Sequence, residues 1–337
     1  PALWDYGMSM SNLGDIDRQT LAGAISTGTH GTGIDSGILS TQISKMELMT
    51  PEKGWVQCSE ENNPELFRAA QVSLGALGII ASITLDLEPA YYLHERVRKQ
   101  SLGYCLNNLD DLRQNNRHFE FFWFPGTEIA LTKTLNKTDQ PDSDSSWQIG
   151  ERIENLLFEV LCGTGTVAPV LSPLLNKLTV FGASTSDCNG RSYEIFSTVR
   201  SVRFNEMEYS IPIESTSEVL RRIRNLIERN HPEVQFPVEV RFVSGDDIPL
   251  SPAYGDNRAF IALHKYHRKP YEEFFRSAES IFRDFGGRPH WGKMHYQSAP
   301  DLRGIYPQWD DFQRVRKRLD PKGVMLNDYL EGLFDEK

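Results

Sequence analysis

The sequence predicts an α+β protein, and three observations support this fold class. Amphipathic helices are expected at residues 215–227 and 271–285, where apolar side chains recur every three or four positions. Strands with alternating or continuous apolar residues are expected at 43–49, 79–87 and 236–243. Helices and strands follow one another without a regular βαβ repeat, which favours α+β over a doubly wound parallel sheet.

The composition is that of a globular chain, and its 337 residues are enough for two domains. The net charge of −10 argues against general affinity for nucleic acid or anionic membranes. No apolar run is long enough to cross a bilayer. No metal-ligand spacing is present, so we expect no metal site. The cysteines lie far apart, which favours free thiols in a reducing, cytoplasmic location: Cys58, Cys105, Cys162 and Cys188.

A glycine-rich stretch at 21–33, LAGAISTGTHGTG, dominates the N-terminal part of the chain. Its glycines alternate with small hydroxyl residues around His30, and we expect no side chain here to build a core. Backbone N–H groups and small hydroxyls suit a phosphate or another flat polar ligand. The alternative is a plain loop without a ligand. Neither a P-loop nor a strand–GxGxxG–helix unit is present, so a nucleotide would be held in another fashion.

Short strands at 43–49 and 55–58 are expected around a turn at 51–54. Asn63 is expected to cap a helix that begins at Pro64. The next strand alternates apolar and polar residues, with a predicted buried face of Ile79, Ala81, Ile83, Leu85 and Leu87.

Aromatic residues are dense from Phe119 to Phe124 and are expected mostly in the core, the alternative being that part of the run lines a substrate cavity. A polar stretch at 138–146 is expected to form a surface loop. A helix is expected at 151–161, where apolar residues have helical spacing.

Two local signals mark the start of one later helix and the end of the other. Ser215 and Glu218 have the spacing of a capping box ahead of the helix at 215–227. Gly286 stands where a glycine would terminate the helix at 271–285.

The strand at 236–243 places Glu239 and Arg241 together on one face and four apolar side chains on the other. The carboxylate can accept hydrogen bonds from a polyhydroxylated substrate, while the guanidinium donates to it and stabilises negative charge. The alternative is a solvent-facing sheet side with a weak ion pair. His264 shares a predicted strand face with Ala262, where a lone histidine is more often structural than catalytic.

A third candidate is Arg288–Lys293, RPHWGK, which follows the end of a predicted helix. A lysine near an electron-accepting ring can stabilise the anionic reduced form of that ring. It can also lower the pKa of a substrate hydroxyl. The alternative is a turn that carries a surface lysine.

Several segments, in order along the chain, resemble the sugar-lactone and alditol oxidases. They are residues 12–17 (NLGDID), 22–33 (AGAISTGTHGTG), 73–80 (SLGALGII), 290–293 (HWGK) and 320–330 (DPKGVMLNDYL). This group includes D-arabinono-1,4-lactone oxidase, L-gulonolactone oxidase and alditol oxidase, and it belongs to the vanillyl-alcohol-oxidase type of FAD flavoproteins. The resemblance covers nearly the whole chain.

The resemblance implies three parts. Residues 1–90 would form the second half of a vanillyl-alcohol-oxidase-type FAD-binding domain. Residues 91–289 would form an α+β substrate or cap domain with an antiparallel sheet, and residues 290–337 would return to the flavin site. Members of the family carry a further FAD-binding portion ahead of the position of Pro1. We therefore expect a separate N-terminal fragment or an upstream segment to complete the FAD domain, and we expect activity to require it.

The resemblance also implies the reaction. An alcohol carbon of a sugar 1,4-lactone or alditol would pass a hydride to N5 of FAD, and O2 would then accept the electrons to give hydrogen peroxide. The alternatives are a non-catalytic subunit that kept the fold, and a dehydrogenase with another electron acceptor. The exact sugar and covalent attachment of the FAD stay open.

By this resemblance, Glu239, Arg241 and Lys293 are catalytic and bind substrate. Glu239 would orient the substrate hydroxyls and serve as the base, while Arg241 and Lys293 would stabilise negative charge. His264 stands where alditol oxidases have a threonine, and it would also contact substrate. The residues implied to contact FAD are Ser26, Thr27, Gly28, Thr29, His30, Gly31, Gly33, Gly78, Ile79 and His290.

Overall fold

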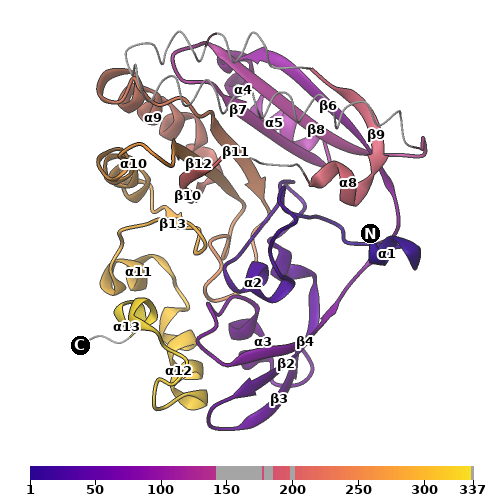
Figure 1. Ribbon diagram of the computed structural model, residues 1–337, viewed down its shortest axis with the longest axis vertical. Coiled ribbons are helices and arrows are strands. Elements are labelled where there is room, and N and C mark those ends of the chain that lie inside the picture. The colour runs from indigo at the N-terminus through magenta and orange to yellow at the C-terminus, as the bar shows by residue number, and fades with distance from the viewer. Residues whose placement is uncertain (142–176, 178–184, 198–201, 335–337) are drawn as a thin grey trace.

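The computed structural model describes residues 1–141, 177, 185–197 and 202–334. Its strands form an eight-stranded sheet, a three-stranded sheet and a two-stranded pair (Figure 1), and all neighbouring strands pair antiparallel. The predicted α+β class with an antiparallel sheet is therefore confirmed. Within the described residues, no helix combines the length and the apolar character needed to cross a membrane.

The eight-stranded sheet has the strand order β13-β10-β12-β11-β7-β8-β6-β9. Its strands are β6 (Tyr92–Ser101), β7 (His118–Trp123), β8 (Ile129–Thr138), β9 (Asp187–Arg191), β10 (Phe204–Pro212), β11 (Val238–Val243), β12 (Arg258–Tyr266) and β13 (Arg288–Pro289). Four helices pack on one face: α4 (Leu102–Asn107), α5 (Leu109–Gln114), α9 (Thr216–Asn230) and α10 (Glu272–Asp284). The predicted core position of Phe119, Phe121 and Trp123 is confirmed, because all three are fully buried under these helices.

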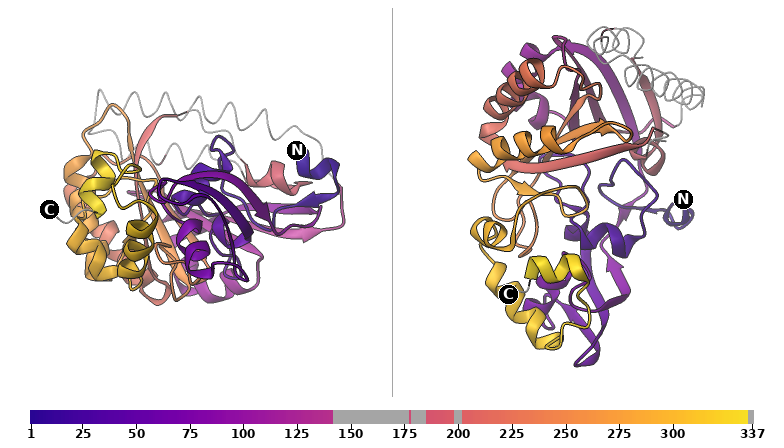
Figure 2. Two further views of the ribbon diagram at one scale, coloured as in Figure 1. Left: turned by 90° about the horizontal axis from the view of Figure 1, so that it is seen from below. Right: turned by 60° about the vertical axis from the view of Figure 1, so that its left-hand side comes forward.

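The three-stranded sheet has the order β3-β2-β4 and forms a second core with the helices around it. Its elements are β2 (Ile43–Thr50), β3 (Gly54–Ser59), β4 (Ile79–Leu85), α2 (Leu21–Ser26), α3 (Pro64–Gln71), α11 (Ala299–Ile305), α12 (Trp309–Leu319) and α13 (Asp328–Phe334). The remaining described elements are α1 (Ala2–Asp5), β1 (Met8–Ser9), η1 (Leu39–Gln42), β5 (Glu88–Pro89), α8 (Ser192–Phe196) and η3 (Ile213–Ser215). Figures 1 and 2 show α2 and the loop after it between the two sheets.

The expectation that the glycine-rich stretch builds no core is wrong for its first half. Residues 21–26 form α2, and the Thr20 hydroxyl caps this helix by accepting a hydrogen bond from the N–H of Gly23. Ile25 is fully buried in the second core. The helix ends at Ser26, and Gly28, whose φ of 72° suits glycine, leads into the loop with His30.

The predicted buried face of β4 is wrong at Ile79 and Ala81. Glu47 of β2 pairs with Ser82, but the next residue of β2 pairs with Ile80, so β4 carries one extra residue at this point. This β-bulge reverses the alternation. Ile79 is consequently 64% exposed, while Ile80 packs against the core on the same side as the later apolar residues of the strand.

The helix at α9 is confirmed, but its predicted capping box is wrong. The 3₁₀ turn η3 leads directly into α9, so Ser215 already has helical backbone angles and its side chain makes no capping hydrogen bond. Asn63 precedes a helix that begins at Pro64, as predicted, yet its side chain donates to the carbonyl of Gln57 instead of capping. Gly286 ends α10 with a φ of 63°, as predicted.

The predicted helix at 151–161, Cys162 and most of the polar stretch at 138–146 lie outside the described residues. The three other cysteines are free, as predicted. The boundaries proposed for the domains remain predictions.

Candidate active site

A row of polar residues lies on the face of the eight-stranded sheet that the helices leave uncovered. Strand pairing sets Glu206 of β10 opposite His264 of β12, and sets Glu208 and Glu239 on either side of Ala262. Residues opposite each other in a sheet point to the same side. The small side chain of Ala262 leaves space between the two carboxylates. Glu208, Glu239, Ala262 and His264 are buried, and Glu206 is half-buried.

Arg241 is the centre of this row. Its Nη2 donates to Glu208 Oε1 at 2.7 Å, its Nε lies 3.3 Å from Glu239 Oε1, and its Nη1 lies 3.7 Å from Asp15 Oδ1. Burial alone would lower the pKa of Arg241, but Glu208 and Glu239 raise it well above its ordinary value. The guanidinium is therefore a fixed positive charge, held from several sides. Glu239 and Arg241 share one face as predicted, and the alternative of a solvent-facing ion pair is wrong.

His30 comes to this row from the glycine-rich loop. Its Nε2 lies 3.3 Å from Glu208 Oε1, its Nδ1 lies 2.7 Å from the carbonyl oxygen of Gly31, and its ring packs on Phe260 with the centroids 3.9 Å apart. Arg241 also donates to the carbonyl of His30. The loop is therefore fastened to the sheet through both its main chain and its histidine.

The glycines around His30 are required by neighbouring protein. A Cβ on Gly31 would overlap the carbonyl oxygen of Leu13, and one on Gly33, where φ is 139°, would come within 2.7 Å of the carbonyl oxygen of Arg117. These two glycines thus allow the loop to pass between other segments of the chain. Their role as ligand contacts stays a prediction.

The segment with His290 and Lys293 closes the site from the C-terminal side. The main-chain N–H of His290 donates to the carbonyl of Glu208, and its ring centroid lies 5.6 Å from that of His30. Burial lowers the pKa of His290 to about 3, so the ring is neutral at physiological pH.

Lys293 Nζ donates to Glu206 Oε2. Burial alone would lower the pKa of Lys293, but Glu206 and Glu208 raise it, which keeps the ammonium charged. The alternative of a surface lysine is wrong.

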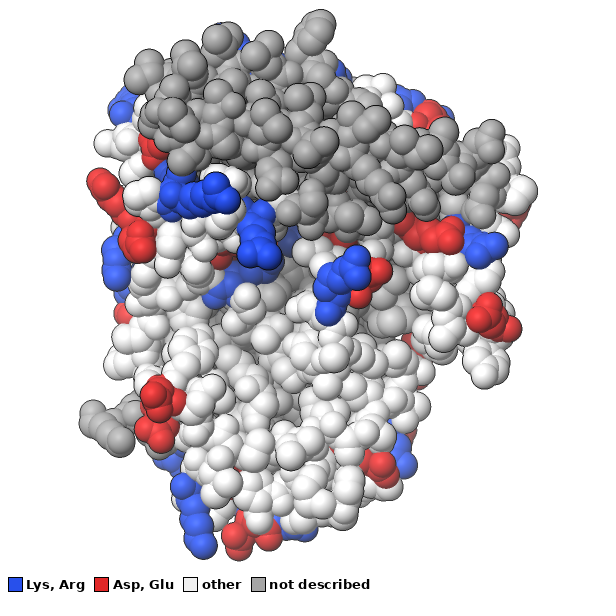
Figure 3. Space-filling view, in the orientation of Figure 1, with Lys and Arg blue, Asp and Glu red and all other residues white. Residues whose placement is uncertain are grey.

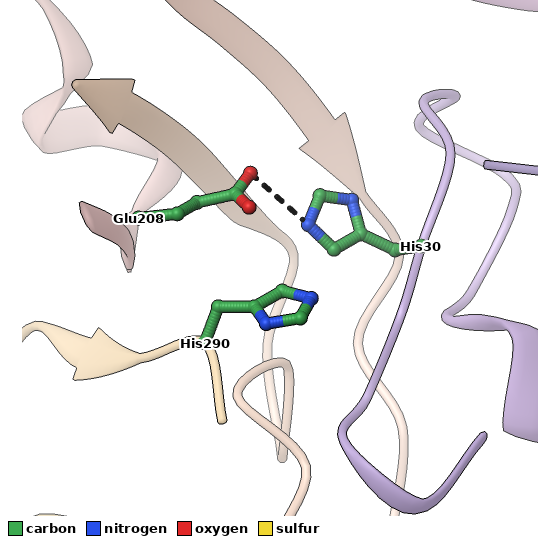
Figure 4. A group of neighbouring side chains, drawn as sticks. All are labelled: His30, Glu208 and His290. Atoms are coloured by element: carbon green, nitrogen blue, oxygen red, sulfur yellow. Dashed lines mark ion pairs between the residues drawn. The ribbon is translucent and has the colours of Figure 1, made fainter. Parts of the chain in front are cut away.

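Three of these side chains converge, as Figure 4 shows: His30, Glu208 and His290, from three separate parts of the chain. One nitrogen or oxygen of each lies within 4.8 Å of the others, a spacing that would suit a metal ion. Arg241, however, donates to the same carboxylate at 2.7 Å, and its positive charge opposes a dication here. His290 Nδ1 also accepts a hydrogen bond from the N–H of Gly292. We therefore assign no metal to this cluster.

His264 lies beside the site with its ring between two aromatic side chains. Its Nε2 is 3.4 Å from Glu206 Oε1, and its ring centroid lies 4.9 Å from that of Phe204 and 5.9 Å from that of Phe236. The structure thus joins His264 to Lys293 through Glu206. Its contact with substrate stays a prediction.

Glu206, Glu208 and Asp15 also belong to the site and were not predicted from the sequence. The signal for the two glutamates was present, because the stretch EMEYSI at 206–211 alternates polar and apolar residues at period two. Asp15 carried no comparable signal, since its neighbourhood is loop. Figure 3 shows few charged side chains at the centre of the lower half of this side of the molecule.

The other residues predicted to bind a cofactor lie in two places. Ser26, Thr27 and Thr29 are half-buried at the end of α2, and a Cβ on Gly292 would lie 3.3 Å from Thr27 Oγ1, so this end of α2 touches the Lys293 segment. Gly78 packs instead against the backbone of β2, and the exposed Ile79 follows it. Their contact with a cofactor stays a prediction.

The chemistry of the site fits a flavin. Glu208 Oε2 and His264 Nδ1 are buried and make no hydrogen bond within the described chain. Such groups cost about 1–3 kcal/mol each when no ligand or water meets them. Arg241 and Lys293 are fixed cations that can balance the negative charge of a reduced flavin. Half-buried hydroxyls at the end of α2 complete a set of polar donors suited to the polar groups of FAD.

Known proteins resemble this chain in sequence. The family profile of D-arabinono-1,4-lactone oxidase matches residues 83–333. An L-gulono-1,4-lactone dehydrogenase of Mycobacterium tuberculosis is 44% identical over 332 residues, which cover 98% of this chain and 77% of that protein. An L-gulonolactone oxidase of Mus musculus is 36% identical over 99% of this chain and 78% of its own length. An alditol oxidase of Streptomyces sp. is 27% identical over 98% of this chain and 77% of its own.

Solved structures share the fold. A solvent-stable cholesterol oxidase superposes with a TM-score of 0.83 and 16% identity, covering 98% of this chain and 79% of that chain. Cholesterol oxidase from Brevibacterium sterolicum gives a TM-score of 0.79 and 16% identity, with 99% and 78% covered. At this identity the likeness shows the fold alone, an α+β fold like that of these cholesterol oxidases.

The profile match and the two relatives above 30% identity agree with the residues that the structure gathers. The chain belongs to the D-arabinono-1,4-lactone oxidase family, whose members are FAD-dependent oxidoreductases that act on the CH–OH groups of sugar lactones and alditols.

Proposed function

We propose that this chain binds FAD against the His30 loop and oxidises an alcohol carbon of a sugar 1,4-lactone or alditol at Glu239, Arg241 and Lys293. The observation that carries the proposal is the buried row on the sheet face, where Arg241 is ion-paired with Glu208 and lies beside Glu239. Such a row costs desolvation energy and gives little net stability by itself. A set of fixed, buried charges is more simply understood as a site for chemistry.

The two cations have distinct tasks in this proposal. Arg241 is held rigidly by three carboxylates, so it can donate to a substrate oxygen without rearrangement. Lys293 belongs to a different segment and is 23% exposed, so it is reachable from outside while Glu206 fixes its position. Together they stabilise negative charge that develops on the substrate oxygen.

Glu239 is the proposed base. It lies 3.3 Å from Arg241 Nε on the same face of β11, and its carboxylate oxygens can accept the proton of the substrate hydroxyl. His290 is the weaker candidate, because its pKa of about 3 makes it a poor proton acceptor at neutral pH.

FAD would lie against Ser26, Thr27, Thr29, His30 and His290, and when bound it supplies the acceptor for the two electrons that leave the alcohol carbon. Gly28, Gly31 and Gly33 would shape the loop that carries these contacts. A role for Gly78 and Ile79 in binding FAD is part of the same proposal.

The acceptor and the setting of the reaction are further parts of the proposal. We propose O2 as the electron acceptor, with hydrogen peroxide as product. A dehydrogenase is the second candidate, because one relative carries that name. We also propose a cytoplasmic location, and a separate N-terminal fragment or upstream segment that completes the FAD site.

Spectroscopy tests the proposal directly. The purified protein, with FAD and any fragment that copurifies, should show flavin absorbance that bleaches without oxygen when L-gulono-1,4-lactone or xylitol is added. Peroxide release on admission of air separates an oxidase from a dehydrogenase. If FAD fails to bind in equilibrium dialysis, or if binding occurs and no lactone or alditol bleaches it, the proposed function is wrong.

A further inference from the structure

A cavity opens beside Lys293. Its volume is about 560 Å³, within the range of about 300–1,000 Å³ found for small-molecule sites. The start of β10 and the segment from Trp291 to Tyr296 form most of its wall, and Tyr329 of α13 adds to it. Lys293 and Glu206 lie in the same wall, so the cavity and the proposed reaction site share these two residues.

Glu206 offers unused acceptor capacity to this cavity. Its Oε2 accepts from Lys293, and its Oε1 lies 3.4 Å from His264 Nε2. A carboxylate has about four lone-pair positions, which leaves room for further hydrogen bonds. Burial raises the pKa of Glu206, but Lys293 and His264 outweigh this and lower it to about 2. The group is thus an ionised acceptor at neutral pH, and hydroxyl groups are its natural partners.

The segment from Trp291 to Tyr296 also contains polar groups that make no hydrogen bond within the described chain. Tyr296 Oη and His295 Nδ1 are buried and make no hydrogen bond within that part of the chain. Arg276 packs on the ring of Tyr296, 3.9 Å from the centroid, and Tyr329 Oη lies 2.9 Å from His295 Nε2. The rings are therefore held in place while two of the polar groups lack a partner. Fixed aromatic rings combined with donors and acceptors suit a chain of hydroxylated carbons.

We infer that this cavity is the subsite for the hydroxylated side chain of the substrate lactone, with Glu206 as its hydrogen-bond acceptor and Tyr296 as a second polar contact. The inference rests on the proposed function, because it assumes that the lactone ring lies at Lys293. It adds a specificity: lactones with a longer hydroxylated side chain use the cavity, and those with a shorter one do not. Glu206 then has two tasks, since it also holds Lys293.

Two lactones test the subsite in the FAD-loaded enzyme. L-gulono-1,4-lactone and D-arabinono-1,4-lactone both contain the five-membered lactone ring, and the side chain of the first is longer by one hydroxylated carbon. Tyr296→Phe should raise the KM for the longer lactone by about three- to tenfold and that for the shorter one less than twofold, with kcat unchanged. Glu206→Gln should raise the ratio of the two KM values by about tenfold and should also lower kcat for both, because it loosens Lys293.

Matched controls separate the subsite from general damage. Tyr104→Phe alters a tyrosine on α4 that does not line the cavity, and Glu233→Gln removes the carboxylate that pairs with Lys265, another lysine of the sheet. Both controls should leave the KM ratio unchanged. Circular dichroism checks that each variant is folded, and Tyr296→Phe carries the test if Glu206→Gln fails to fold.

The outcomes are distinct. An unchanged KM ratio in Tyr296→Phe, or equal KM increases for both lactones, overturns the subsite while the proposed function stands. If neither lactone bleaches the flavin of the unaltered enzyme, the proposed function fails. Calorimetric titration of L-gulono-1,4-lactone then decides the cavity on its own: weaker binding to Tyr296→Phe supports the subsite, and equal binding overturns it.

Discussion

Arg241 Nη2 reaches Glu208 Oε1 at 2.7 Å across a strand that separates them. Arg241 belongs to β11 and Glu208 to β10, and β12 lies between these two strands. The bridge passes over Ala262, the residue of β12 that pairs with both Glu208 and Glu239. A small residue at this point is therefore a condition for the charge row.

Ala262→Leu should break this arrangement. The added side chain would occupy the space under the bridge, and overpacking of this kind costs about 1–3 kcal/mol of unfolding free energy. Ala259→Leu is the matched control, because Ala259 is equally buried on the same strand but faces the helix side of the sheet. Urea unfolding should show comparable losses for both variants, whereas flavin reduction by the lactone should slow much more in Ala262→Leu. Equal slowing in both would mean that the bridge has no special part in the site.

Glu208→Gln tests the charge itself. Burial raises the pKa of Glu208, but Arg241 and His30 outweigh it and hold the pKa well below the ordinary value of 4.5. The carboxylate thus stabilises the fold fully above that value, and the stabilisation is lost as the pH falls below it. We expect the variant to lose about 3–5 kcal/mol near neutral pH, since it leaves a buried guanidinium short of a partner.

The pH dependence distinguishes this explanation from simple mispacking. The difference in unfolding free energy between the unaltered protein and Glu208→Gln should be constant near neutral pH and should shrink below about pH 4.5. A difference that stays the same in acid would contradict the assigned charge. Glu218→Gln, on the exposed face of α9, should change stability by about 0.5 kcal/mol or less.

The sequence was informative where a property is local. Alternation along 236–243 placed Glu239 and Arg241 on one face, and helix periodicity identified α9 and α10, because both patterns depend on neighbouring residues alone. The partner of Arg241 could not be predicted in this way, since the order β10-β12-β11 is set by packing between distant segments. The bulge in β4 was missed for the same reason: it appears only against its partner strand.

The glycine-rich loop shows a second limit. The composition of this stretch predicts a ligand-binding loop, which stays a prediction, whereas Gly31 and Gly33 are required because the loop passes close to other parts of the chain. A glycine in a sequence indicates a close approach to the backbone, but it does not show whether a ligand or another part of the chain approaches. The motif HWGK was more informative about the site. Its histidine, His290, contacts Glu208 of β10, and its lysine, Lys293, pairs with Glu206 of the same strand.

Lys293→Met should slow flavin reduction by about 10²–10³-fold, the usual effect of removing one charge that stabilises a developing oxyanion. The pKa of Lys293 is raised, because Glu206 and Glu208 outweigh the effect of burial. A raised lysine pKa keeps the charge until the pH rises through it, so the reduction rate should show no loss of this group below the ordinary value of 10.5. Stopped-flow absorbance without oxygen measures both effects. Lys137→Met, which removes a remote ion pair with Glu88, should reduce the flavin at the normal rate.

Gly31→Ala tests whether the loop is placed by its packing. The new methyl group would overlap the carbonyl of Leu13, so the loop must move, and His30 would move with it, away from Glu208. We expect a loss of about 1–3 kcal/mol in unfolding free energy and a clear weakening of FAD binding in equilibrium dialysis. Gly103→Ala in α4 is the control. A Cβ on Gly103 would lie 4.0 Å from the nearest atom, Ser101 Oγ, so the substitution should leave stability unchanged or slightly higher. If Gly31→Ala loses stability and still binds FAD as before, the loop serves the fold, and the proposed cofactor contact of His30 is wrong.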